Sequence, residues 1–386
     1  MTIAEQITRI KNAKAAIKQS IENKGVTVSD TAKLDEYPAL IDSISGEGGG
    51  DSNNHYWPDF FELKTGHGKN NISYRYLFYY SYATDIVFPN IDSSQVIDMG
   101  YMFANCSSLQ SLDISNLRTD SVTTMQDMFY YLPKSITSLD LSHFSTNNVT
   151  DMSYMFSGCS GLTSLDLSSF DANKVTTMKN MFYLCADLQT IIGLENINAN
   201  SLTGAAINSM FQSCKSIVSL DLSGLNVSNV TEMQSIYDGC QNLEYINITG
   251  WDTSKAYTLY KVFTDCKKLV TIDGVLDGSG LKNGLYNGSA THPFYNCTSL
   301  ETLYLKNIYK DVSITNAAKF SIDLGATKVK DECLVYIINE LPDLINNKGL
   351  TATDKIVLTL PPSNTLTEEQ VQVAILKGWQ VANTTY

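Results

Sequence analysis

The central part of the chain repeats one hydrophobic pattern about every 26 residues. An aromatic residue, usually preceded by Met, recurs at intervals of 26, 27, 26, 29, 26, 26 and 31 residues. These aromatic positions are Phe103, Phe129, Phe156, Phe182, Phe211, Tyr237, Phe263 and Phe294. In most copies a Cys such as Cys106 follows three residues later, and then an L-x-x-L-x-L run such as Leu109, Leu112 and Ile114. A fixed period of this length predicts a solenoid of stacked structural units.

Each repeat is expected to form a strand over its leucine run and a short helical turn over its Met-Phe segment. This combination and period match leucine-rich repeats, so the expected fold is an α/β-repeat solenoid with parallel strands. One unit cannot bury its own apolar face, and neighbouring units therefore share a continuous core. The ten methionines after Met1 fall in two columns, one next to the aromatic and one four residues before it. Gap-filling core is their expected role.

The sequence predicts four segments that flank the repeats of residues 87–305. Residues 1–46 are predicted to form a helical attachment or oligomerisation module, and residues 47–54 a Gly-rich linker. An aromatic-rich N-terminal cap is predicted over 55–86 and an αβ C-terminal cap over 306–386. The isoleucine seam near the N-terminus favours a homotrimer. The aromatics of the N-terminal cap have a second interpretation, a surface on which sugars stack. Thr367 and Gln370 form a capping pair that opens a helix in the C-terminal cap.

Composition narrows the classes of function. The net charge of −13 repels phosphate backbones, so no nucleic-acid partner is expected. The apolar runs are shorter than the ~20 residues of a membrane span, and no membrane insertion is expected. The N-terminus lacks a secretory signal, which predicts a soluble protein released without the secretory route. Seven of the eight cysteines share one repeat column; buried free thiols are the favoured reading, although stacked columns could also approach disulfide distance.

The sequence shows no pairing of residues that indicates catalysis. No acid/base pair, cofactor motif or metal-ligand spacing stands out, so we expect neither enzymatic activity nor a cofactor or bound metal. The candidate binding residues form one outward column of the predicted strands. That column contains Asp113, Asp140, Asp166, Ile192, Asp221, Asn247, Asp273 and Tyr304.

Two interpretations of this column remain open. It could bind a cation or a glycan, or it could be a solvated repeat feature that caps a turn, which is the favoured reading. Because solenoid faces vary without disturbing the core, any receptor contact is expected on this open sheet face and not on the Met-Phe side. The change from Asp to Asn247 and Tyr304 in later repeats suits a sugar ligand.

The repeat resembles a known family. Residues 149–170, with the sequence VTDMSYMFSGCSGLTSLDLSSF, are similar to the BspA-type leucine-rich repeat of mycoplasma surface lipoproteins, and the resemblance covers about residues 87–305. It implies a non-catalytic role in adhesion at a surface. The flanks, around 10–37 and 366–381, resemble tail and fibre proteins of tailed bacteriophages.

Taken together, these resemblances give two hypotheses for function. BspA-type adhesins normally carry secretion or anchoring signals, which this sequence does not show. The favoured hypothesis is therefore a phage virion protein, made in the host cytoplasm. It would attach to other virion proteins through residues 1–46 and to a host-surface protein or polysaccharide through the repeats. The alternative is a BspA-like adhesin of a bacterial cell surface.

Overall fold

The computed structural model describes most of the second of two compact units in the chain. The units comprise Met1–Ile72 and Ser73–Tyr386. The described residues are 72–88, 90, 92–282, 292–309, 322–344 and 356–384. The predicted helical module, the linker and most of the predicted N-terminal cap therefore lie outside the described residues.

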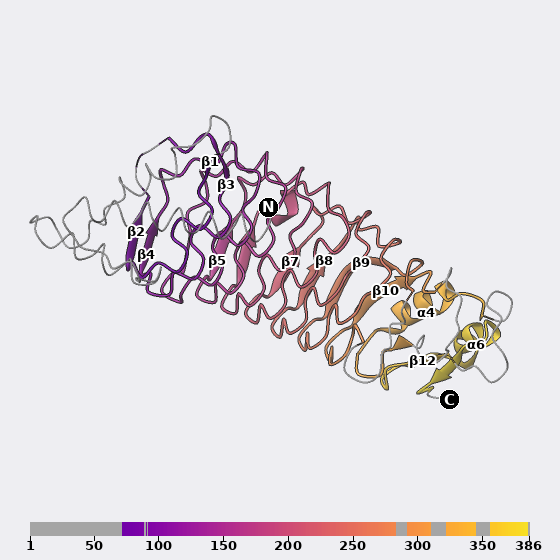
Figure 1. The fold of residues 1–386 in the computed structure, drawn as a ribbon. Helices are drawn as coiled ribbons and strands as arrows, with labels where there is room; N and C mark the ends of the chain where they lie inside the picture. The colour runs from indigo at the N-terminus through magenta and orange to yellow at the C-terminus, as the bar shows by residue number, and fades with distance from the viewer. Residues whose placement is uncertain are drawn as a thin grey trace, which may run out of the picture. The chain divides into compact units, whose positions relative to one another are not determined.

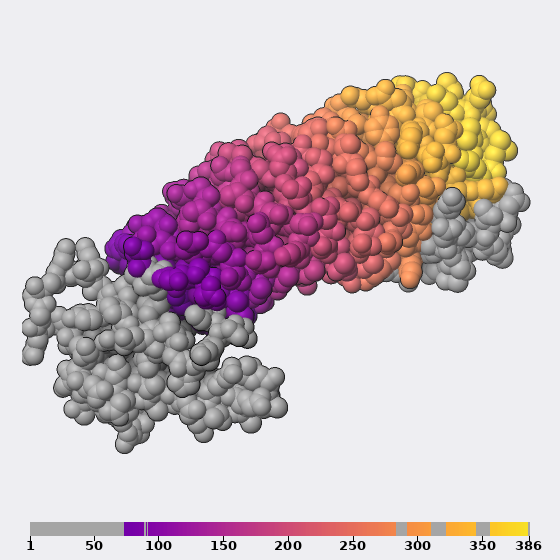
Figure 2. All heavy atoms as spheres, turned by 90° about the horizontal axis from the view of Figure 1, so that it is seen from above, coloured from indigo at the N-terminus to yellow at the C-terminus, as the bar shows by residue number. Residues whose placement is uncertain are grey.

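The second unit is a solenoid of parallel strands, as the repeat pattern predicts (Figure 1). The strands of this part are β1 (Ile72–Ser73), β2 (Asp85–Val87), β3 (Val96–Asp98), β4 (Ser111–Asp113), β5 (Ser164–Asp166), β6 (Thr190–Ile192), β7 (Ser219–Asp221), β8 (Tyr245–Asn247), β9 (Thr271–Asp277) and β10 (Thr302–Lys306). From β2 on, the strands of the leucine runs pair in parallel register with those of neighbouring turns, for example Leu220 opposite Ile246. β1 and β3 form a separate two-stranded sheet. In the space-filling view, the coloured turns run from indigo to yellow in chain order (Figure 2).

The sheet formed by the leucine runs is interrupted. It divides into the pairs β2–β4 and β5–β6 and the four-stranded group β7 to β10. The leucine run at 138–140 forms no strand, and a 3-10 helix, η3 (Leu194–Asn196), follows β6. Gly193 before η3 has φ of 85°, and a Cβ there would lie 2.6 Å from the backbone nitrogen of Ser168. This close approach requires glycine.

The Met-Phe segments are not helical, which corrects the sequence prediction. In repeat after repeat, the residues two before and two after the ladder aromatic have positive φ, as at Tyr101 (56°) and Asn105 (59°) around Phe103. Such alternation is incompatible with an α-helix. The backbone N–H groups of Tyr101, Phe103 and Asn105 instead donate to carbonyls of the next turn at 2.8–2.9 Å. The intervening Met102 donates to the carbonyl three residues before it.

The aromatic residues of these segments stack into a continuous ladder through the core. Successive ring centroids lie 5.1–6.0 Å apart with interplanar angles of 4–12°. The ladder begins at Phe78, one turn before the first aromatic that the sequence pattern identified. Near-parallel pairs of this kind contribute about 0.5–1.5 kcal/mol each beyond the burial of their area. All ten repeat methionines are buried beside the ladder, as predicted.

The thiols of the cysteine column donate hydrogen bonds to backbone carbonyls of this core. In seven turns the thiol donates to the backbone carbonyl of the ladder aromatic one turn earlier, at 2.9–3.1 Å. A buried carbonyl without a donor is costly, which explains why a weak donor recurs at this position. All eight cysteines are free and buried, and burial raises the pKa of Cys106 and Cys159 to about 12. The prediction of buried free thiols is confirmed.

The C-terminal part forms the predicted αβ cap. Its elements are β11 (Ile322–Asp323), α4 (Asp331–Glu340), β12 (Val357–Thr359), α6 (Glu368–Leu376) and β13 (Gln380–Ala382). The three strands form a parallel sheet in the order β11-β12-β13. Thr367 and Gln370 form the predicted capping box of α6, with reciprocal bonds of 3.3 and 2.8 Å. Helix α4 packs against β10 and α6, which covers the end of the repeat stack.

Candidate functional site

The predicted aspartate column occupies the outward face of the strands and caps the turns that follow them. In Asp113, Asp140, Asp166 and Asp221, the carboxylate Oδ1 accepts the backbone N–H of the residue two positions later, at 2.9–3.0 Å. In the last three, the Ser hydroxyl at that position also donates, at 2.6–2.7 Å. The Asp side chains therefore reproduce the turn-capping geometry that was the favoured reading.

Hydrogen bonding also sets the charge state of this column. The Ser142 and Ser168 hydroxyls and backbone N–H groups lower the pKa of Asp140 and Asp166 below the ordinary carboxyl value. At neutral pH the exposed carboxylates are consequently ionised. Further along, Asn247 donates to Asp221 at 3.0 Å and the Tyr245 hydroxyl donates to Asp273 at 3.0 Å. These carboxylates are engaged with neighbouring side chains of the same face.

Tyr304 differs from the other members of the column. It lies on β10 and is half-buried, and its ring packs edge-to-face on Tyr336 of α4 with centroids 5.2 Å apart. Helix α4 thus covers part of the sheet face at its C-terminal end. The structure does not bring Tyr304 together with Asp113, Asp140 and Asp166 at one point, because the column runs along successive turns.

A second group of outward side chains lies on the Met-Phe turns. In each of the first five turns, a tyrosine occupies the position two before the ladder aromatic, the position one after it, or both. We call Tyr76, Tyr79, Tyr101, Tyr130, Tyr154 and Tyr183 the tyrosine surface. Their rings contact one another within and between turns: Tyr76 stacks on Tyr101 at 5.0 Å, and Tyr130 meets Tyr154 edge-on at 6.4 Å. Tyr76 and Tyr79 keep 48% and 39% of their area exposed.

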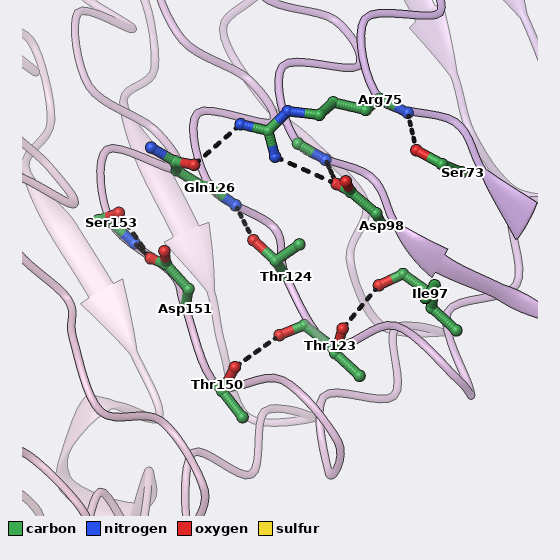
Figure 3. Close-up of polar contacts among 11 residues, drawn as sticks. Ser73, Arg75, Ile97, Asp98, Thr123, Thr124, Gln126, Thr150, Asp151 and Ser153 are labelled. Carbon is green, nitrogen blue, oxygen red and sulfur yellow. Dashed lines mark hydrogen bonds and ion pairs between the residues drawn. The ribbon is translucent and has the colours of Figure 1, made fainter. Parts of the chain in front are cut away.

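A polar cluster around Arg75 lies beside the first of these tyrosines, and Figure 3 shows its contacts with Asp98 and Gln126. The Arg75 guanidinium lies 3.3 Å from Asp98 and donates to Gln126 at 3.0 Å. It also lies over the rings of Tyr76 and Tyr101, at 5.2 and 5.0 Å from their centroids. One cation therefore bridges three successive turns while a carboxylate balances its charge. Beside it, the hydroxyls of Thr123 and Thr150 each donate to the carbonyl one turn earlier, at 3.0 Å.

Asp127 is a buried carboxyl within the same turns. It is only 4% exposed and accepts a hydrogen bond from the Tyr101 hydroxyl. Burial raises the pKa of Asp127 to about 6, and burial together with this bond raises the pKa of Tyr101 to about 12. Because desolvation disfavours its charged form, Asp127 titrates near neutrality while the aspartates of the sheet face stay ionised.

The described part of the chain contains neither a metal-holding cluster nor a membrane-spanning helix. Within it, no group of three or more His, Cys, Asp or Glu side chains is placed to hold a metal ion. None of its helices combines the length and apolarity that crossing a membrane requires.

The sequence reading anticipated one of the two outward surfaces. It identified the aspartate column and treated the aromatics up to residue 86 as a cap or a sugar-stacking surface. It did not connect Tyr76 and Tyr79 with Tyr101, Tyr130 and Tyr183 in later turns. The signal was present: each of these tyrosines lies at a fixed offset from a ladder aromatic, and Phe78 continues the ladder.

Comparisons with known proteins identify the repeat. A family model described as "Mycoplasma protein of unknown function, DUF285" matches residues 71–140, 97–216 and 205–273, together more than half of the chain. No curated protein matches the chain.

Solved structures of bacterial proteins share low similarity with the chain. A leucine-rich repeat protein from Bacteroides ovatus is 17% identical with a TM-score of 0.29, over 68% of this chain and 76% of that one. An internalin from Listeria monocytogenes is 12% identical with a TM-score of 0.25, over 78% and 87%. A leucine-rich cell surface protein from Faecalibacterium prausnitzii is 15% identical with a TM-score of 0.20, over 62% and 85%. None of these comparisons supports the resemblance of the flanks to phage proteins or a role in a virion.

Proposed function

The chain belongs to the family described as "Mycoplasma protein of unknown function, DUF285", and from this premise we propose that it is a non-catalytic adhesin displayed on a bacterial surface. The observation that carries the proposal is that separate residue columns of the solenoid stabilise the fold and form its surface. Buried Phe, Met and Cys columns stabilise the stack, and the outward columns can therefore change without loss of the fold. Extended, variable faces of this kind suit attachment to a large ligand.

The chemistry of the outward faces favours binding over catalysis. The aspartates of the sheet face cap turns, and several of them are also held by neighbouring side chains. A catalytic acid/base pair needs two groups whose environments separate their pKa values around one reacting centre. Asp127 has a pKa of about 6, and it is already engaged as the acceptor of a hydrogen bond from the Tyr101 hydroxyl. The resemblance to BspA-type repeats adds the surface role.

Surface display is tested on intact cells that carry the gene. Antibodies raised against the full chain are applied before and after permeabilisation, and intact cells are treated with protease. We expect labelling before permeabilisation and loss of the protein on treatment. Labelling that appears only after permeabilisation contradicts the proposal. Detection of the chain in purified phage particles from the same strain would support a virion role in its place.

A further inference from the structure

The tyrosine surface alternates large and small side chains along the stack. Directly after the ladder aromatic, successive turns carry Tyr79, Ala104, Tyr130, Ser157 and Tyr183. Ala104 and Ser157 are completely buried, whereas Tyr79 is exposed and Tyr130 and Tyr183 are half-buried. The intervening turns carry Tyr101 and Tyr154 at the other outward position, two residues before the ladder aromatic, so the tyrosines of this column project from every second turn. With turns ~4.8 Å apart, they recur about every 10 Å.

The surface presents mainly rings and hydroxyls, because its charged groups are paired or buried. Its cation, Arg75, is paired with Asp98, and Asp127 is buried against Tyr101. Tyrosine has an apolar ring face and a polar tip, so it can contact an apolar surface and a hydroxyl-bearing edge together. No exposed Leu, Ile, Val or Met side chain accompanies the six tyrosines among the described residues 73–183, apart from the distant Val87 on β2.

The alternation is confined to the first five turns. In later turns, the position after the ladder aromatic carries Gln212, Asp238 and Thr264, and then Tyr295. The buried aromatic and cysteine columns continue through those turns. The core therefore does not require tyrosine at the outward positions, since other residues serve there equally well. Because the alternating run of tyrosines is limited to the first five turns, and Tyr295 recurs in this column without such a run around it, we attribute the run to a ligand and not to folding.

We propose that the tyrosine surface binds a neutral, extended polysaccharide that lies along the solenoid axis, with alternate sugars stacked on Tyr79, Tyr130 and Tyr183. This inference rests on the proposed function as an adhesin and identifies the ligand class of its site. It places the ligand on the Met-Phe side, opposite to the sheet face that the sequence predicts.

Two features favour this ligand over a protein. An extended β-linked glycan turns successive sugars over, so that the same ring face recurs at every second unit, and the tyrosines repeat in the same alternating way. A folded partner does not impose such a period on a surface. The net charge of −13 also disfavours acidic polysaccharides, which a neutral chain avoids.

The first experiment measures where a polysaccharide contacts the intact protein. The full chain is treated with tetranitromethane, with and without soluble hydroxyethylcellulose, galactomannan or xyloglucan, and nitrated tyrosines are mapped by mass spectrometry. We expect at least one of these polymers to protect Tyr79 and Tyr130 and to leave Tyr245 of the sheet face reactive. Protection of Tyr245 with no protection of Tyr79 and Tyr130 overturns the inference, and so does a lack of protection by all three polymers.

The second experiment measures affinity in native gels that contain the same polymers. We expect the triple variant Tyr79→Ser, Tyr130→Ser, Tyr183→Ser to bind about tenfold more weakly or worse, because three stacking contacts are lost together. Tyr295→Ser is the matched control, since Tyr295 occupies the same column in a late turn and is 38% exposed. Thermal unfolding shows whether both variants are folded. If the triple variant is not folded, the nitration map of the intact protein decides the question.

The outcomes separate the inference from the proposed function. Unchanged binding by a folded triple variant overturns the polysaccharide site. If the intact protein labels on the cell surface and binds host proteins but no polymer, the adhesin proposal stands and the inference is wrong. If it binds polysaccharide through these tyrosines but is absent from the surface, the inference stands and the adhesin proposal is wrong.

Discussion

The sheet face and the Met-Phe turns of the solenoid are built from the same repeats but are regular in different ways. The sheet face has named strands, yet its ladder breaks between β4 and β5 and again between β6 and β7. The Met-Phe turns have neither strands nor helices, yet ring stacking continues unbroken from Phe78 to Phe294. Backbone and thiol hydrogen bonds repeat alongside the rings. The cohesion of this stack therefore comes mainly from the segment without regular secondary structure.

The outward side chains differ in the same way. On the sheet face, the outward residues are mostly Ser, Thr and Asp, whose short side chains form hydrogen bonds within the turns. On the Met-Phe turns, large tyrosines lie over a rigid ladder in the first five turns and give way to polar residues later. A stable inner column permits such variation, because an outward side chain there contributes little to the core.

The largest test of this comparison removes one rung of the ladder. Phe156 is fully buried, with neighbouring rings at 5.6 and 5.8 Å. Phe156→Ala should lower the free energy of unfolding by about 3–5 kcal/mol through lost burial and the cavity left behind. Urea unfolding measures the loss, with the half-exposed Tyr154→Ala as the control that changes little. A clearly larger loss for Leu165→Ala on β5 would place the cohesion in the sheet instead.

The thiol column provides the next test. Cys185 donates to the carbonyl of Phe156 at 3.0 Å, and Cys185→Ala leaves that buried carbonyl without this donor. We expect a loss of about 1–3 kcal/mol. Cys185→Ser keeps a hydroxyl donor at nearly the same place and should lose less. Equal losses for the two variants, measured by the same unfolding transitions, would mean that packing and not donation explains the column.

The buried carboxyl of the tyrosine surface predicts a pH dependence. The pKa of Asp127 rises from 3.8 to about 6 on folding, so the folded chain favours the protonated form. Its contribution to stability is complete below pH ~4, decreases as pH rises through about 6, and is constant above. Asp127→Asn should remove this decrease, a difference on the order of 1–2 kcal/mol near neutral pH. Parallel pH profiles of the two proteins would contradict the assignment.

A stabilising change is expected at the one tyrosine of the ladder. The Tyr237 ring stacks between Phe211 and Phe263, and its buried hydroxyl has no hydrogen-bond partner among the described residues. Tyr237→Phe keeps the stacking and removes an unsatisfied polar group, so stability should rise by about 1 kcal/mol. A decrease in the midpoint of thermal unfolding would show that the hydroxyl is satisfied in solution.

The smallest effect is expected on the sheet face. Asp166 accepts from the backbone N–H and hydroxyl of Ser168, which lowers its pKa. This support is present above the unfolded pKa near 4 and is lost as pH falls through the lower folded value. Asp166→Ala should reduce the midpoint of thermal unfolding slightly, and Asp166→Asn, which keeps an acceptor, should reduce it less. A large decrease in this midpoint would show that the outward residues of the sheet face contribute strongly to stability, contrary to the comparison.

The sequence alone determined the period, the buried columns and the kind of fold. Phe, Met, Cys and Leu recur at fixed offsets, and a shared core is the only way in which such units can bury them. The capping pair of α6 was readable for a similar reason, because Thr367 and Gln370 interact within one helical turn. The turn-capping role of Asp140 and Asp166 also depends on residues only two positions away.

Only the tertiary structure decided how the Met-Phe segment folds and which outward residues meet. The Met102 spacing suits a helical turn, but hydrogen bonds to the next turn favour alternating positive φ, and those partners lie about 26 residues away in the chain. The same contacts between turns bring Tyr79, Tyr130 and Tyr183 into one column and place Tyr304 against α4. Local pattern fixes which residues are buried, whereas the neighbours of an exposed residue depend on how the turns stack.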